Sequence, residues 1–149
     1  MALFIDSATV THGIQLAVAP VFLLTAVSGL IGAVAGRLSR IIDRGRKLEE
    51  NLRLNTEPEL VPRWQAELAM LRRRGLLANS AIGLLTLCAF MIGLTIVVLF
   101  LGETTVIQIE RLAIYGFLAG VLCFMAALSC FFAETLLATR VLRFRGVAV

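Results

Sequence analysis

Residues 13–52 read GIQLAVAPVFLLTAVSGLIGAVAGRLSRIIDRGRKLEENL. Residues 13–36 of this stretch carry no charged side chain. Residues 37–52 are rich in charge and contain no proline that would end the helix. A helix needs about 20 apolar residues, at a rise of about 1.5 Å each, to cross a hydrocarbon core of about 30 Å. The stretch therefore predicts a helix that crosses a membrane and then continues into water.

Two further uncharged runs occupy residues 75–102 and 112–133. Apolar residues make up 59% of the chain, which exceeds the roughly 45–50% that is usual in soluble domains. We therefore expect an all-α protein with three transmembrane helices, in a single membrane domain over residues 1–149. The three spans are expected at about 13–36, 76–101 and 112–138.

Basic residues gather between the first two spans and after the third. Residues 37–74 hold 10 of the 14 Lys and Arg residues, and the C-terminal segment adds Arg140, Arg143 and Arg145. Short loops rich in Lys and Arg stay in the cytoplasm, so we expect residues 37–75 and the C-terminus inside and the N-terminus outside. This topology accounts for the net charge of +4, and nucleic acid is therefore not an expected partner.

The segment between the first two spans has the pattern of two paired helices. Apolar residues and glycines recur at alternating spacings of three and four in two series, which are Leu38, Ile41, Gly45, Leu48, Leu52 and then Val61, Trp64, Leu68, Leu71, Gly75. Such spacing gives each helix one narrow apolar seam, as in a coiled coil. Residues 55–58, which contain Pro58, separate the two series. The pattern predicts a cytoplasmic antiparallel helical hairpin over residues 37–75, with arms of about 25 Å.

Small residues recur every four positions in two of the spans. Ser28, Gly32 and Gly36 form one series, and Gly116 and Gly120 form the other. Small residues at this spacing allow helix backbones to approach closely in a membrane. They are candidate helix-packing residues, either within one chain or between the subunits of a homo-oligomer.

Glu134 is an ionisable residue at the inner end of the third apolar run. A carboxylate at that depth is costly unless it has a partner. The third span descends towards the side where the first span leaves the membrane, so we expect a buried polar cluster in which Glu134 accepts a hydrogen bond from Arg37, Arg40 or Asn79.

The inventory of reactive residues favours no catalytic, metal or cofactor site. His12 is the only histidine, which excludes a histidine-rich metal site and a histidine-based triad. Cys88, Cys123 and Cys130 all fall in apolar runs, where cysteine is commonly a small packing residue. We therefore expect no bound cofactor and no enzymatic activity.

The chain resembles the DUF2721 family of small bacterial membrane proteins, a domain of unknown function. The resemblance lies in IQLAVAPVFLLTAVSGLIGAVAGRLSRIIDRGRKLE at 14–49, LRRRGLLANSAIGLLTLCAFMIGLTIVVLFLG at 71–102 and ETLLATRVLR at 134–143. It implies the same topology and a location in the bacterial inner membrane, but it implies no activity and no site residues.

Two functions are compatible with this organisation. The first is a homo-oligomeric channel or transport-type pore, with the hydroxyl residues Thr25, Ser28, Thr86 and Thr95 as candidate lining. The alternative is a membrane adaptor or scaffold whose hairpin docks a protein partner of unknown identity. The expected partners are accordingly the lipid bilayer and, for a pore, further copies of the chain.

Overall fold

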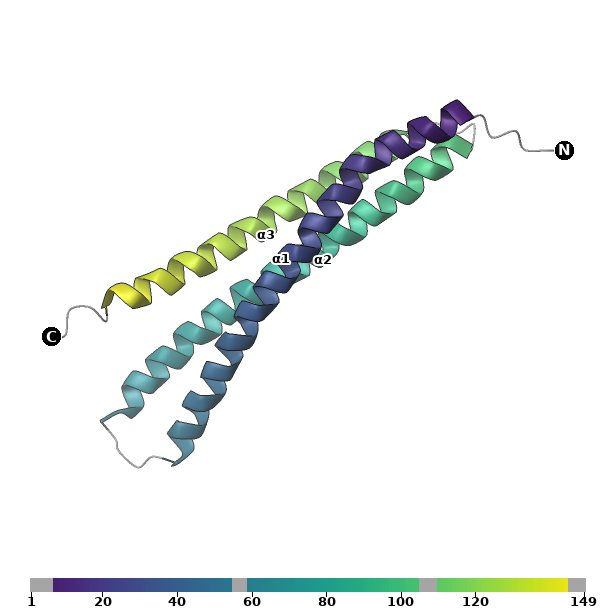
Figure 1. Cartoon of the computed structure of the whole chain (residues 1–149). Helices are drawn as coiled ribbons and strands as arrows, with labels where there is room; N and C mark the ends of the chain where they lie inside the picture. Colours follow the sequence, from purple (N-terminus) through teal and green to yellow (C-terminus); the bar gives the residue numbers. More distant parts are fainter. Residues whose placement is uncertain (1–6, 55–58, 105–109, 145–149) are drawn as a thin grey trace. The chain divides into compact units, whose positions relative to one another are not determined.

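The computed structural model describes residues 7–54, 59–104 and 110–144. These residues form three helices, α1 (Ser7–Leu54), α2 (Val61–Thr104) and α3 (Glu110–Phe144), and the described part of the chain contains no strand (Figure 1). The predicted all-α fold is confirmed. Each helix contains a stretch long and apolar enough to cross a membrane, namely Ala17–Leu54, Val61–Gly102 and Arg111–Thr139. The chain is therefore a multi-pass membrane protein.

Helix α1 is one continuous element with Pro20 inside it. The first uncharged run and the charged segment that follows it therefore belong to the same helix, as expected. Helix α1 ends at Leu54 and α2 begins at Val61, with Pro62 in its first turn. A proline there is favourable because the first backbone N–H groups of a helix have no intrahelical partner.

The contacts of the chain group into two units, and each helix contributes to both. Unit 1 consists of Met1–Leu30 and Leu84–Met125, and unit 2 consists of Ile31–Gly83 and Ala126–Val149. The boundaries between the units fall after Leu30, after Gly83 and after Met125.

Unit 1 has a core of small and branched side chains. Its buried residues include Val27, Leu85, Cys88, Ile92 and Ala113. A Cβ atom added at Gly116 would lie 2.8 Å from the Thr95 hydroxyl oxygen, and one added at Gly120 would lie 2.9 Å from the Ile92 side chain. The two glycines of α3 therefore permit the close approach of α2 within a single chain, which is one of the two roles expected for them.

Unit 2 contains the paired arms of α1 and α2. Ile41, Leu48 and Leu71 form a buried cluster with Trp64 packed against it. The nearest side chain to a Cβ atom at Gly45 would be that of Leu68, at 4.0 Å, whereas a Cβ atom at Gly75 would lie 3.7 Å from Ile41. Contacts that move back along α1 as they move forward along α2 define an antiparallel pair. The predicted seam is therefore present.

A second cluster of unit 2 lies where the arms meet α3. Val34, Ala78 and Ala81 are its buried members, and Leu38, Ile82, Cys130 and Phe131 pack against them. Leu38, which was expected in the hairpin seam, packs against this cluster and would also lie 4.0 Å from a Cβ atom at Gly75 of the seam. The small side chains of Ala78 and Ala81 allow three helices to converge here, next to Glu134.

Candidate functional site

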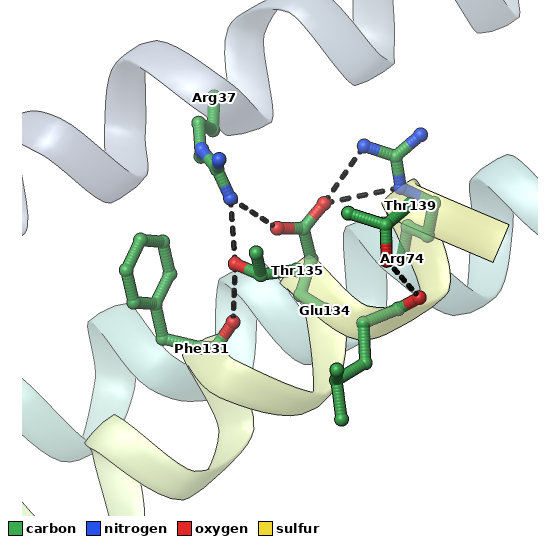
Figure 2. A network of polar contacts seen from close by, with 7 residues as sticks. Arg37, Arg74, Phe131, Glu134, Thr135 and Thr139 are labelled. Carbon is green, nitrogen blue, oxygen red and sulfur yellow. Dashed lines mark hydrogen bonds and ion pairs between the residues drawn. The ribbon is translucent and has the colours of Figure 1, made fainter. Parts of the chain in front are cut away.

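Glu134 lies in unit 2 with none of its surface exposed. Among the described residues, only Thr95 and Glu134 are buried polar or charged residues. Phe131, Glu134 and Thr135 are three and four positions apart on α3, so they share a face of that helix. Figure 2 shows that this face receives two arginine side chains from the other helices.

Arg37 of α1 makes the first set of contacts. Its Nη1 donates to Glu134 Oε2 at 2.9 Å and to Thr135 Oγ1 at 2.8 Å. Thr135 in turn donates from its hydroxyl to the Phe131 carbonyl at 3.0 Å. The Arg37 guanidinium carbon also lies 5.1 Å from the centre of the Phe131 ring, which is cation–π distance.

Arg74 of α2 makes the second set. Its Nε and Nη2 donate to Glu134 Oε1 at 3.0 and 2.8 Å. Each oxygen of the carboxylate therefore pairs with a different arginine, and each arginine comes from a different helix (Figure 2). We call Arg37, Arg74, Phe131, Glu134 and Thr135 the Glu134 cluster.

The hydrogen bonds of the cluster explain how a carboxylate is accommodated at this depth. A buried charge is costly unless it is paired and its remaining polar atoms are hydrogen-bonded. In the described part of the chain, no buried side-chain nitrogen or oxygen lacks a hydrogen-bond partner. Because three helices each supply a charged residue, separating any one of them would leave an unpaired charge. The cluster therefore joins α1, α2 and α3 within unit 2.

The sequence anticipated one of the two arginines. Arg37 is among the donors predicted for Glu134, and the contact is present. Arg40 and Asn79 were the other predicted donors, but both are exposed, and Arg74 donates instead. Successive residues of an α-helix are 100° apart, so Arg74 and Asn79 point in directions that differ by about 140°.

A signal for Arg74 was available in the periodicity of α2. Arg74 lies three residues after Leu71 and four before Ala78, and both of these residues are buried. Residues at this spacing share one helix face. Arg74 therefore lies on the buried face of α2, whereas Asn79 is exposed.

The small residues predicted for helix packing separate into two groups. Gly116 and Gly120 are packed against α2, as described above. Ser28, Gly32 and Gly36 are exposed, and a Cβ atom at either of these glycines would meet no atom within 4 Å. This face of α1 therefore makes no close contact with the described part of the same chain.

The candidate pore-lining hydroxyls are also not equivalent. Thr95 is buried and donates to the Met91 carbonyl at 2.8 Å, so a single chain does not present it on a surface. Thr25 is exposed and donates to the Val21 carbonyl at 3.2 Å. Ser28 and Thr86 are exposed as well.

Reactive side chains form no metal-binding group in the described ranges. No three His, Cys, Asp or Glu residues there are arranged to hold a metal ion. Cys88, Cys123 and Cys130 are free thiols. The side chain of His12 lies outside those that the structure describes. The Glu134 cluster is therefore the site at which charge and burial coincide.

The comparisons with known proteins identify a family but no function. A family model described as "Protein of unknown function (DUF2721)" matches residues 17–144. No curated protein matches the chain, and no solved structure matches it.

Proposed function

This chain belongs to the DUF2721 family of proteins of unknown function, and we propose that it is a membrane adaptor that presents its α1/α2 hairpin to a protein partner in the cytoplasm. The observation that carries the proposal is the Glu134 cluster. It joins both arms of the hairpin to α3, close to the point where the charged segment begins at Arg37. A hairpin fixed in this way keeps a defined orientation at its base, which a docking surface requires.

The arms of the hairpin are further joined by ion pairs. Arg44 donates to Glu67 at 2.8 and 3.0 Å, and Arg72 lies 3.6 Å from Glu49. These pairs are exposed, so each stabilises the hairpin by at most about 1 kcal/mol. They favour one alignment of the arms, while other charged residues remain exposed for a partner, among them Arg46, Lys47, Glu50, Arg53 and Arg63. Exposed charges of this kind contribute more to the rate and specificity of association than to affinity.

The proposal assigns the hairpin to the cytoplasm on the basis of its basic residues. It assigns no reaction to the chain, because the Glu134 carboxylate is fully engaged by two arginines. A carboxylate in that arrangement stabilises a structure, whereas a general base needs an acceptor oxygen that is available to the substrate.

Site-specific photo-crosslinking tests the adaptor. A photoreactive amino acid is introduced at Ala66 or Ala69, which are exposed on the α2 arm, and the cells are irradiated before the membranes are isolated. We expect one discrete adduct with a second protein, identified by mass spectrometry. The matched control carries the photoreactive residue at Phe132, which is exposed on α3 and should give lipid adducts. If Ala66 and Ala69 give only adducts between copies of this chain, the adaptor proposal is wrong.

A pore formed by several copies is the second candidate, and the exposed face of α1 favours it. Gly32 and Gly36 have open space above them, and helices in membranes associate through such small residues. Thr25 and Ser28 are exposed on the same helix and could line a path between copies. In this proposal the polar path exists only in the assembly.

Ion flux measured with reconstituted vesicles tests the pore. We expect flux that depends on the number of chains per vesicle, and a loss of flux in Gly32→Leu because the added side chain would separate the α1 helices. The control is Gly83→Leu, since Gly83 also has open space above it but lies on α2. Equal flux from Gly32→Leu and the unmodified chain would exclude an α1-lined pore.

A further inference from the structure

Four arginines line one cavity at the base of the hairpin. The cavity lies in unit 2, has a volume of about 320 Å³ and is lined by Arg37, Arg40, Ile41, Arg44, Leu71 and Arg74. Three of the arginines come from α1 and one from α2. We call it the arginine pocket. Its location between the two arms distinguishes it from the α3 side of the Glu134 cluster, although Arg37 and Arg74 contribute to both.

Each of these arginines has N–H groups that the described contacts do not use. A guanidinium carries five N–H donors on three nitrogens. Arg37 uses only Nη1, and Arg44 and Arg74 each use Nε and Nη2. Arg40 forms no hydrogen bond or ion pair with any described residue. The pocket therefore offers donors from four side chains to a further acceptor.

The arginine pocket also carries more positive than negative charge. Glu134 pairs with Arg37 and Arg74, and Glu67 pairs with Arg44. Asp43 lies three residues after Arg40 on α1 but forms no ion pair with it in the described ranges. Four guanidinium groups thus face two carboxylates, and the surplus positive charge favours a bound anion. Arginine pairs especially well with phosphate because its planar donors match the phosphate oxygens.

The position of the pocket along the helices indicates which anion it is placed to bind. Arg37 is the first charged residue after the uncharged run of α1, and Arg74 is the last before the uncharged run of α2. The pocket therefore begins where two spans leave the hydrocarbon core and extends along α1 for about 10 Å, from Arg37 to Arg44. Phospholipid phosphates occupy this depth, and Ile41 and Leu71 supply an apolar surface beside the arginines.

We propose that the arginine pocket binds the phosphate group of an anionic phospholipid. Basic pockets between membrane helices on the cytoplasmic side are suited to such headgroups. The binding would place a second anion on the arginines that already hold Glu134, and it would stabilise the base of the hairpin only in a membrane that contains anionic lipid. This inference uses the membrane location of the chain and the proposed cytoplasmic placement of the hairpin, and it depends on neither the adaptor nor the pore function.

Native mass spectrometry of the full chain in detergent tests the proposal. The chain is titrated with phosphatidylglycerol, with zwitterionic phosphatidylcholine and, in a separate arm, with inorganic phosphate. We expect saturable retention of phosphatidylglycerol that phosphatidylcholine does not reproduce and that millimolar inorganic phosphate does not displace. Arg40→Gln is expected to weaken binding about fivefold, the effect of removing one basic residue near an anionic headgroup.

Arg73→Gln is the matched control. Arg73 is exposed like Arg40 and adjoins Arg74 in sequence, but it does not line the pocket. We expect it to bind phosphatidylglycerol as the unmodified chain does, and Arg40→Lys to retain more binding than Arg40→Gln because the positive charge remains. Equal weakening by Arg40→Gln and Arg73→Gln would show diffuse attraction and overturn the site. Retention of phosphatidylcholine equal to that of phosphatidylglycerol, or full displacement by inorganic phosphate, would overturn the lipid assignment.

Discussion

Glu134 combines a charged side chain with complete burial. Its carboxylate is buried and accepts from Arg37 and Arg74, so its removal would leave two guanidinium groups without their partner. Breaking a buried ion pair from one side costs about 3–5 kcal/mol. The Arg37 side chain is 37% exposed, and water would replace part of its lost interaction. The lower end of that range is therefore the appropriate expectation.

Glu134→Leu should reduce the free energy of unfolding in detergent by about 3 kcal/mol. Glu134→Gln should reduce it by less, because the amide oxygen still accepts from one arginine. Thermal unfolding followed by circular dichroism measures both. Thr139→Val on the exposed face of α3 is the control and should change stability by less than about 0.5 kcal/mol. A leucine variant as stable as the control would show that the cluster contributes nothing to the fold.

Arg73 and Arg74 are adjacent on α2 but differ in their exposure and their hydrogen bonds. The Arg74 side chain is 22% exposed and donates two hydrogen bonds to Glu134, whereas Arg73 is exposed. We expect Arg74→Gln to lower the unfolding free energy by about 2 kcal/mol, since hydrogen bonds between charged groups are worth about 1.5–3 kcal/mol. Arg73→Gln should have almost no effect. The same unfolding measurement applies, and equal effects of the two variants would contradict the assigned hydrogen bonds.

The pairing of the two hairpin arms depends on the apolar seam between them. Ile41 is buried in the seam, whereas the adjacent Ile42 is 44% exposed. Ile41→Asp would bury a charge without a partner, so we expect the arms to separate more readily and proteases to cleave faster within residues 50–62. Ile42→Asp adds the same charge on an exposed face and should leave the cleavage rate unchanged. Equal protection of the two variants would show that Ile41 is not part of the seam.

The contact between α2 and α3 in unit 1 depends on glycine. A Cβ atom at Gly120 would lie 2.9 Å from the Ile92 side chain and 3.5 Å from Met91. We therefore expect Gly120→Val to reduce the unfolding free energy by about 1–3 kcal/mol, the usual effect of overpacking. Gly83→Val, which adds the same side chain where nothing lies within 4 Å, is the control. A Gly120→Val variant that unfolds at the same temperature as Gly83→Val would exclude the close contact.

For the whole molecule, the distribution of basic residues predicts the orientation in the membrane. The positive-inside rule predicts the hairpin inside and the N-terminus outside. In a chain with alanine at all three cysteine positions, an impermeant maleimide should label Asp6→Cys in intact cells. It should label Glu50→Cys only after the membrane is opened. Labelling of Glu50→Cys in intact cells would reverse the topology and remove the basis for a cytoplasmic partner.

The sequence by itself determined the features that depend on neighbouring residues. Three long uncharged runs predict three apolar helices. The length needed to cross a bilayer and the absence of charge within it are both properties of consecutive residues. The hairpin seam is likewise local, since residues spaced by three and four share a helix face. The depth of Glu134 made a partner necessary, and it made Arg37 a reasonable candidate.

Only the tertiary structure decided which surfaces meet. Arg74 replaces Asn79 at Glu134 because α2 presents the face of Leu71 and Ala78 to the core, and the rotation of one helix against another is set by packing that no single segment contains. Equal reasoning applies to the glycines. Gly116 and Gly120 are covered by α2 while Gly32 and Gly36 are exposed, although the two pairs have the same spacing in the sequence.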